Sequence, residues 1–86
     1  MEINNLIEII EEKLKKNIKI ENLNIEDKSF LHKKHKNFNK DKFHIKLDII
    51  SFELKQINLV EANKRIHKIL KKEIKDFIHS LQIKIT

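Results

Sequence analysis

Histidines are the side chains of this sequence that offer the widest range of chemistry. Three of the five lie in one stretch, HKKHKNFNKDKFH, at positions 32–44, together with five lysines and two phenylalanines. Imidazole can ligate a metal or exchange a proton near neutral pH, while lysine and phenylalanine can hold phosphates and stack on bases. Three interpretations follow: the histidines are ligands, the lysines form a nucleic-acid patch, or the stretch is a solvated basic loop.

The composition excludes several kinds of chemistry. The chain contains no cysteine, so it has no disulfides, no thiolate metal ligands and no cysteine nucleophile. A zinc site needs about four ligands, which makes a site built from these histidines alone a weak hypothesis. Ser29, Ser51 and Ser80 have no evident base and orienting group around them. We therefore expect a protein that is not an enzyme.

The net charge of +6 favours an acidic partner such as nucleic acid. Lysine, isoleucine and asparagine together make up half of the chain, however, and only one arginine is present. This bias is typical of an A+T-rich genome, in which many lysines are simply solvated. The sequence also lacks the GxxG loop of RNA-binding KH modules. We therefore expect any nucleic-acid binding to be weak and independent of sequence, through Lys33, Lys34, Lys36, Lys40 and Lys42.

The length predicts one domain, residues 1–86. No apolar run is long enough to span a membrane, and the acidic start MEINNLIEII does not resemble a signal peptide. Residues 3–14 have the apolar spacing of a helix, whereas residues 22–26 and 44–49 alternate as strands do. A second helix begins after Asn58, its expected N-cap, and should break near Lys75 before a last strand over residues 78–86. The apolar stripe of this helix consists of Leu59, Ala62, Ile66, Ile69, Leu70 and Ile74.

This order predicts an α+β fold, a two-layer α-β-β-α-(α)-β sandwich whose three-stranded mixed sheet has helices on one face. The first two strands should be antiparallel, and the helical crossover should make the third strand parallel to the second. Parallel strands begin at the same end of a sheet, so His44 and His79, which open the second and third strands, should lie together. The segment between the first two strands leaves from that end too, and would bring His32 and His35 to it.

Strand alternation offers a plainer interpretation of each histidine. His79 has the parity of Leu81, which would make it a histidine at the edge of the core. His44 has the parity opposite to Ile45, which would make it an exposed strand residue. His67 follows a core position of the second helix and is expected on the helix surface.

The ordered set of these residues resembles the BolA family of small proteins with a class II KH-like fold. Ser29 and His32 are similar to the family's serine and histidine after the first strand. Residues 44–51 resemble its second strand, which begins with a histidine and ends with a serine. Residues 78–81, Ile-His-Ser-Leu, resemble the motif that opens its last strand.

The chain also departs from the family pattern. The arginine-histidine pair that the family carries in its second helix reads Ala62-Asn63 here, and the glycine before that helix reads Gln56. The loop between the first two strands is a few residues longer. Contacts made by the arginine-histidine pair therefore do not transfer to this chain.

The resemblance implies an adaptor that pairs with a monothiol glutaredoxin and shares a 2Fe–2S cluster with it. Glutaredoxin cysteine and glutathione would supply sulfur ligands; His79 would be the first ligand from this chain, and His44, His35 or His32 the second. Imidazole binds iron when neutral, and its proton-linked release suits a cluster that is passed on. Alone, the chain is expected to be a monomer with no tightly bound cofactor. A cytoplasmic location is expected, with a mitochondrial one left open; the alternative function is a KH-like nucleic-acid-binding transcription regulator.

Overall fold

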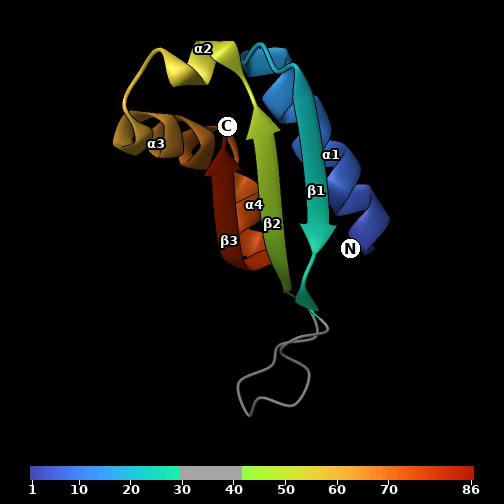
Figure 1. Ribbon diagram of the computed structural model, residues 1–86. Helices are drawn as coiled ribbons and strands as arrows, with labels where there is room; N and C mark the ends of the chain where they lie inside the picture. Colours follow the sequence, from blue (N-terminus) through green and yellow to red (C-terminus); the bar gives the residue numbers. More distant parts are fainter. Residues whose placement is uncertain (30–41) are drawn as a thin grey trace.

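Two layers, a sheet and a set of helices, make up the part of the chain that the computed structural model describes, residues 1–29 and 42–86 (Figure 1). The elements occur in the order α1 (Ile3–Asn17), β1 (Asn22–Asp27), β2 (Phe43–Ile50), α2 (Phe52–Lys55), α3 (Leu59–Ile69), α4 (Lys71–Asp76) and β3 (Ile78–Ile85). The predicted α+β class, with a three-stranded mixed sheet, is confirmed.

The sheet has the order β1-β2-β3, with β2 in the centre. β1 pairs with β2 in antiparallel orientation and β2 pairs with β3 in parallel orientation, as the sequence predicts. The crossover between β2 and β3 contains α2, α3 and α4. Both parallel strands therefore begin at the same end of the sheet.

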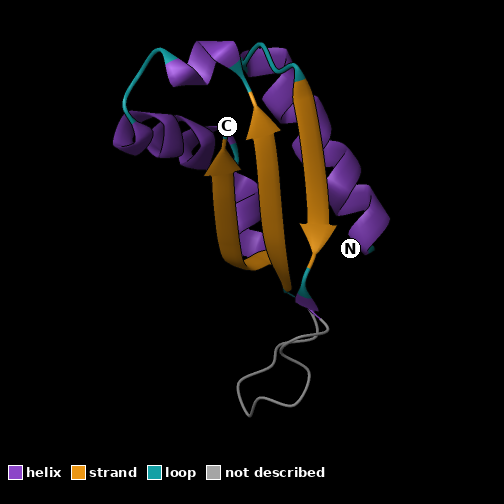
Figure 2. Cartoon of the chain, in the orientation of Figure 1, coloured by secondary structure: helices purple, strands orange, loops and turns teal. Residues whose placement is uncertain are grey.

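The helices cover one face of the sheet (Figure 2). α1 buries Leu6, Ile10 and Leu14, which the helical repeat places on one side, and β2 buries Ile45, Leu47 and Ile49, which strand alternation places on one side. Burying these side chains removes apolar surface from water, and this is the main term that stabilises the fold. The opposite side of β2 carries Lys46 and Asp48.

The helical crossover differs from the prediction in three details. The break falls at Leu70, whose φ of −98° and ψ of 17° end α3, and not near Lys75. Leu70 is fully buried, so the chain turns at a core residue and begins α4 in a new direction. Leu59 is 64% exposed, although the stripe predicted it in the core, because α3 begins beyond the edge of the sheet (Figure 1). The short helix α2 was not predicted.

Side-chain caps explain where α2 and α3 begin. The Ser51 hydroxyl accepts a hydrogen bond from the Leu54 N–H at 3.2 Å, and the Asn58 side-chain oxygen accepts one from the Glu61 N–H at 2.8 Å. Each cap satisfies one of the N–H groups that a helix start leaves without a partner. Asn58 is thus confirmed as an N-cap. Within residues 1–29 and 42–86, no helix has the length and apolar character needed to cross a membrane.

Candidate functional site

The candidate site lies at the end of the sheet where β2 and β3 begin. The Phe43 N–H donates to the Phe77 carbonyl at 2.8 Å, which holds the two strand starts together. The rings of His44 and His79 lie next to each other, with centroids 4.8 Å apart and planes tilted by 56°. The convergence predicted for these two histidines is therefore confirmed. We call His44, His79 and Ser80 the histidine corner.

A register shift sets the position of His79. Phe43 pairs with Ile78, whereas the next residue, His44, pairs with Ser80, so His79 is an extra residue in β3 at this point. Such a bulge reverses the alternation on one strand and redirects a side chain. Ile78 is consequently buried and His79 exposed. The plainer interpretation, in which His79 has the core-facing parity of Leu81, is wrong for this reason.

His44 is buried, with 8% of its surface exposed, so the plainer interpretation as an exposed strand residue is also wrong. Strand β2 is central, so this position is flanked on both sides. The Nδ1 atom of the His44 ring lies 2.6 Å from the Ser80 hydroxyl. The backbone N–H of His44 donates to the Ser29 hydroxyl at 3.0 Å. The His44 carbonyl accepts from the Lys28 N–H at 2.7 Å. These contacts fix both the backbone and the ring of His44.

Ser80 belongs to the Ile-His-Ser-Leu motif, but the sequence did not predict it as the partner of the His44 ring. Its hydroxyl can donate to or accept from the imidazole, so it can hold His44 in either tautomer. A histidine that ligates a metal usually bonds through its other ring nitrogen to such a partner, which orients the ring. The position of Ser80 opposite His44 depends on the bulge, and the sequence has no signal for that bulge.

Ser29 closes the site on the side of β1. Its side chain is buried, its hydroxyl accepts from the His44 N–H, and its own N–H donates to the Asp27 carboxylate at 2.9 Å. An aspartate that bonds the N–H two residues later forms a local turn. Ser29 therefore fixes the direction in which the chain leaves β1.

Several predicted site residues lie outside the described part of the chain. These are His32 and His35, together with the lysines of the expected nucleic-acid patch at 33, 34, 36 and 40. Lys42 is described and is half-buried. His67 is exposed on α3, as predicted. Of the four candidate ligands, the structure thus places His44 and His79.

The histidine corner provides a pair of imidazoles. Among the described residues, no group of three or more histidines, cysteines, aspartates or glutamates is arranged to hold a metal ion. Two nitrogen ligands suffice for one iron of a 2Fe–2S cluster when thiolates hold the other iron, as in Rieske centres. This donor set fits a cluster that is completed by a second molecule.

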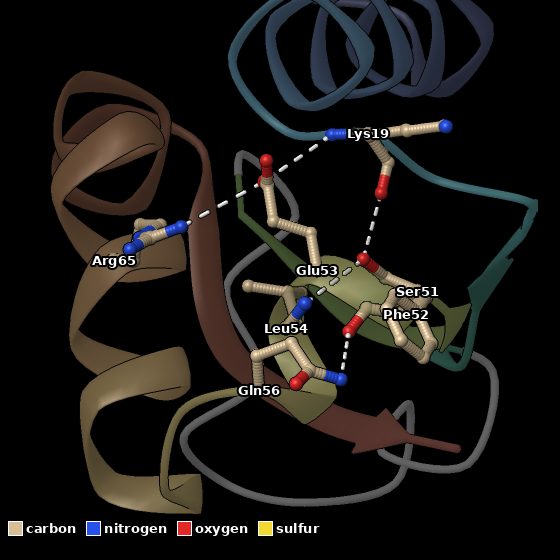
Figure 3. Close-up of polar contacts among 7 residues, drawn as sticks. All are labelled: Lys19, Ser51, Phe52, Glu53, Leu54, Gln56 and Arg65. Atoms are coloured by element: carbon tan, nitrogen blue, oxygen red, sulfur yellow. Dashed lines mark hydrogen bonds and ion pairs between the residues drawn. The ribbon is translucent and has the colours of Figure 1, made fainter.

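The other end of β2 is built for structure. The buried Ser51 hydroxyl donates to the Lys19 carbonyl at 2.7 Å and caps α2 through the Leu54 N–H (Figure 3). The Glu53 carboxylate accepts from the Lys19 N–H at 3.3 Å and lies 3.7 Å from the Arg65 guanidinium. These contacts join the start of β1, α2 and α3. Ser51, the serine at the end of the second strand, therefore has a structural role that requires no ligand.

The two departures from the family pattern are accommodated locally. Gln56 stands where the family has glycine, and its φ of −79° is an ordinary right-handed value that needs no glycine. Ala62 is buried in the core, and the Asn63 amide donates to the Leu59 carbonyl at 2.9 Å within α3. Neither residue of this pair lies at the histidine corner.

The exposed pair of Glu26 and Lys28 lies on β1 and just after it. Their charged groups are 2.6 Å apart. The hydrogen bond from Lys28 and its positive charge hold the pKa of the Glu26 carboxyl below its ordinary value. The pair neutralises charge on the outer face of the sheet.

The chain is similar to known proteins in both sequence and fold. A family model described as BolA-like protein matches residues 14–86. The chain is 36% identical over 76 residues to a Haemophilus influenzae protein named DNA-binding transcriptional regulator BolA, a match that covers 88% of this chain and 71% of that protein. The chain belongs to the BolA family, which confirms the resemblance noted in the sequence.

Solved structures agree with this assignment. The BolA domain of SufE1 from Arabidopsis thaliana superposes with a TM-score of 0.78 at 28% identity, covering 100% of this chain and 93% of that one. BolA1 from the same plant superposes with a TM-score of 0.75 at 30% identity, covering 90% of this chain and 85% of that one. The described part of the chain thus has the fold of BolA domains.

Proposed function

We propose that this BolA family member is an adaptor that binds a monothiol glutaredoxin and co-ligates a 2Fe–2S cluster held between the two proteins. The observation that carries the proposal is the pairing of the His44 and His79 rings at 4.8 Å at the end of the sheet where β2 and β3 begin. The cluster is cargo in iron–sulfur trafficking or iron regulation, and the proposal assigns this chain no catalytic step.

The division of ligands follows from composition. The chain has no cysteine, so the thiolates must come from the glutaredoxin and its glutathione. Imidazole is a borderline ligand that binds iron when neutral and is released on protonation. Mixed ligation of this kind favours transfer of the cluster over permanent storage.

The two imidazoles differ in exposure and in how firmly their surroundings hold them. His79 is exposed on a bulge and can meet a partner without rearrangement of the sheet, so it is the first ligand. The second is His44, His35 or His32. His44 is favoured because Ser80 and Ser29 hold it on a central strand, and a ligand fixed by packing and hydrogen bonds coordinates more reliably than one on a loop.

The test is to mix the protein with a cluster-loaded monothiol glutaredoxin and record the visible circular dichroism. The wild-type chain should change the spectrum of the cluster, and His79→Ala should not. His67→Ala is the matched control, because His67 is also exposed but lies on α3. A His79→Ala spectrum identical to that of the wild type would remove the basis of the proposal.

A second candidate function is nucleic-acid binding. It is favoured by the net charge of +6 and by the similarity to the Haemophilus influenzae protein, which is named as a DNA-binding transcriptional regulator. Affinity for DNA that depends on phosphate contacts should fall steeply with salt. Measuring the dissociation constant for two unrelated duplexes across a range of salt concentrations tests this function. Equal binding of both duplexes would indicate backbone recognition only.

A further inference from the structure

Residues of the helical layer form a cationic groove. It lies where α1 meets α3 and α4, and adjoining hollows share Lys68 as a wall residue. Its main cationic residues are Lys13, Lys16, Arg65, Lys68, Lys72 and Lys75. We call these hollows together the lysine groove.

Basic residues outnumber acidic residues in the lining of this groove. Lys64 and Lys71 also line it, which gives eight basic residues, and its acidic lining residues are Glu61 and Asp76. Glu73 and Glu53 pair with two of these bases, so the groove and its ion-pair partners together hold eight basic and four acidic residues. The groove therefore carries an excess of positive charge.

Basic residues on the sheet and basic residues in the groove differ in how many have acidic partners. On the sheet, Lys28 pairs with Glu26 at 2.6 Å, Lys46 lies opposite Glu26, and Lys84 lies opposite Asp48 in the strand register. In the groove, three bases have acidic partners: Lys13 with Glu73, Arg65 with Glu53, and Lys64 with Glu61. The other five, Lys16, Lys68, Lys71, Lys72 and Lys75, form no ion pair within the described residues.

The helices also place like charges one turn apart. Lys64 and Lys68 are four residues apart in α3, and Lys71 and Lys75 are four residues apart in α4. Like charges at this spacing repel and destabilise a helix. A bound polyanion would relieve this repulsion, so the arrangement suits a surface that is neutralised by a ligand.

We propose that the lysine groove binds the sugar–phosphate backbone of nucleic acid without regard to sequence. This inference rests on the second candidate function and moves its site from the segment after Ser29 to the helical layer. Lysine is a point charge suited to phosphate, whereas the planar guanidinium of arginine suits bidentate recognition of bases, and Arg65 lies 3.7 Å from the Glu53 carboxylate. Recognition therefore stops at the backbone.

An anionic membrane fits this groove less well. Helices that lie on membranes insert an apolar face beside their lysines. The apolar residues that line the described groove, Ile57 and Ile69, are half-buried. The strongly exposed Phe52 and Val60 are not among its lining residues.

The experiment measures fluorescence anisotropy of two labelled DNA duplexes of unrelated sequence with the full chain. Five unpaired lysines correspond to a loss of affinity of about 500-fold between about 50 and 200 mM salt, equally for both duplexes. The triple variant Lys68→Gln, Lys72→Gln and Lys75→Gln should reduce that loss to about 12-fold, because two unpaired lysines remain. Circular dichroism and thermal unfolding verify that each variant is folded.

Two matched triple variants serve as controls. Lys28→Gln, Lys46→Gln and Lys84→Gln remove the same charge from the sheet face and should keep the wild-type salt dependence. If the triple variant Lys33→Gln, Lys34→Gln and Lys36→Gln abolishes DNA binding while the groove variant binds normally, the protein binds nucleic acid but the groove is not the binding site. If the wild type binds no duplex, both the second candidate function and the proposed binding site are wrong. Binding to phosphatidylserine vesicles and not to DNA would instead assign the groove to a membrane surface. None of these variants touches His79, so the cluster proposal is tested separately.

Discussion

Removing the hydroxyl of Ser80 is the most informative perturbation of the histidine corner. This hydroxyl lies 2.6 Å from the Nδ1 atom of His44, which is 8% exposed, while Ser80 itself is exposed at the edge of the sheet. Ser80→Ala therefore removes one hydrogen bond and almost no packing. The ring of His44 loses the contact that orients it, and His79 is unchanged.

The expected magnitudes differ for stability and for ligation. A partly buried hydrogen bond contributes about 0.5–1.5 kcal/mol, so the free energy of unfolding should fall by about 1 kcal/mol. Loss of a group that orients a metal ligand typically lowers metal affinity about 10- to 100-fold. The shared cluster should thus weaken by about 1.4–2.8 kcal/mol, more than the fold does.

The assay combines urea unfolding of the chain alone with visible circular dichroism of the glutaredoxin mixture during titration with an iron chelator. Ser80→Thr keeps a hydroxyl on the same strand position and should keep most of the affinity. If Ser80→Ala lowers stability as expected but leaves the cluster as resistant to the chelator as the wild type, then His44 is not the second ligand. In that case the loop substitutions His32→Ala and His35→Ala become the decisive ones.

Three further outcomes follow from contacts outside the histidine corner. Lys13→Met should destabilise the fold by about 2 kcal/mol in urea unfolding, because the buried Glu73 carboxylate loses its 2.6 Å partner, and Glu73→Leu should restore most of the loss. Ser51→Ala should cost about 1–2 kcal/mol in the same assay, since a helix cap and a buried hydroxyl bond disappear together; an unchanged midpoint would contradict this. The pKa of Glu26 is lower in the folded protein than in the unfolded chain, so its ionised carboxylate stabilises the fold at any pH above the ordinary pKa of glutamate. This contribution is lost as the pH falls through the pKa of Glu26 in the folded protein. Lys28→Gln should raise that pKa in an NMR titration.

The sequence predicted the fold because its signals are local and regular. The spacing of Leu6, Ile10 and Leu14 can only face one side of a helix, and alternation in β2 fixes which side faces the core. The rule for helical crossovers predicted that β2 and β3 are parallel, and therefore that His44 and His79 lie at the same end of the sheet. Both predictions agree with the structure.

The errors arose where tertiary pairing overrides local pattern. The extra residue at His79 shifts β3 by one position relative to β2, and only the pairing of the two strands creates that shift. It inverted the expected exposure of His79 and placed Ser80 beside His44. The break between α3 and α4 at Leu70 could not be predicted either, because the apolar periodicity of the helix continues from Ile69 through Leu70 to Ile74. The lysine groove was also missed, because its residues come from three helices that the sequence cannot place side by side.

The shared cluster can be tested most directly by pulsed electron paramagnetic resonance on the reduced complex with a monothiol glutaredoxin. Only this chain would carry histidine labelled with nitrogen-15, so any strong nitrogen-15 coupling must come from its imidazoles. We predict coupling from two histidines in the wild type and from one fewer in His79→Ala, with His67→Ala unchanged. A spectrum of the wild-type complex without strongly coupled histidine nitrogen would contradict the proposal that this protein ligates the cluster.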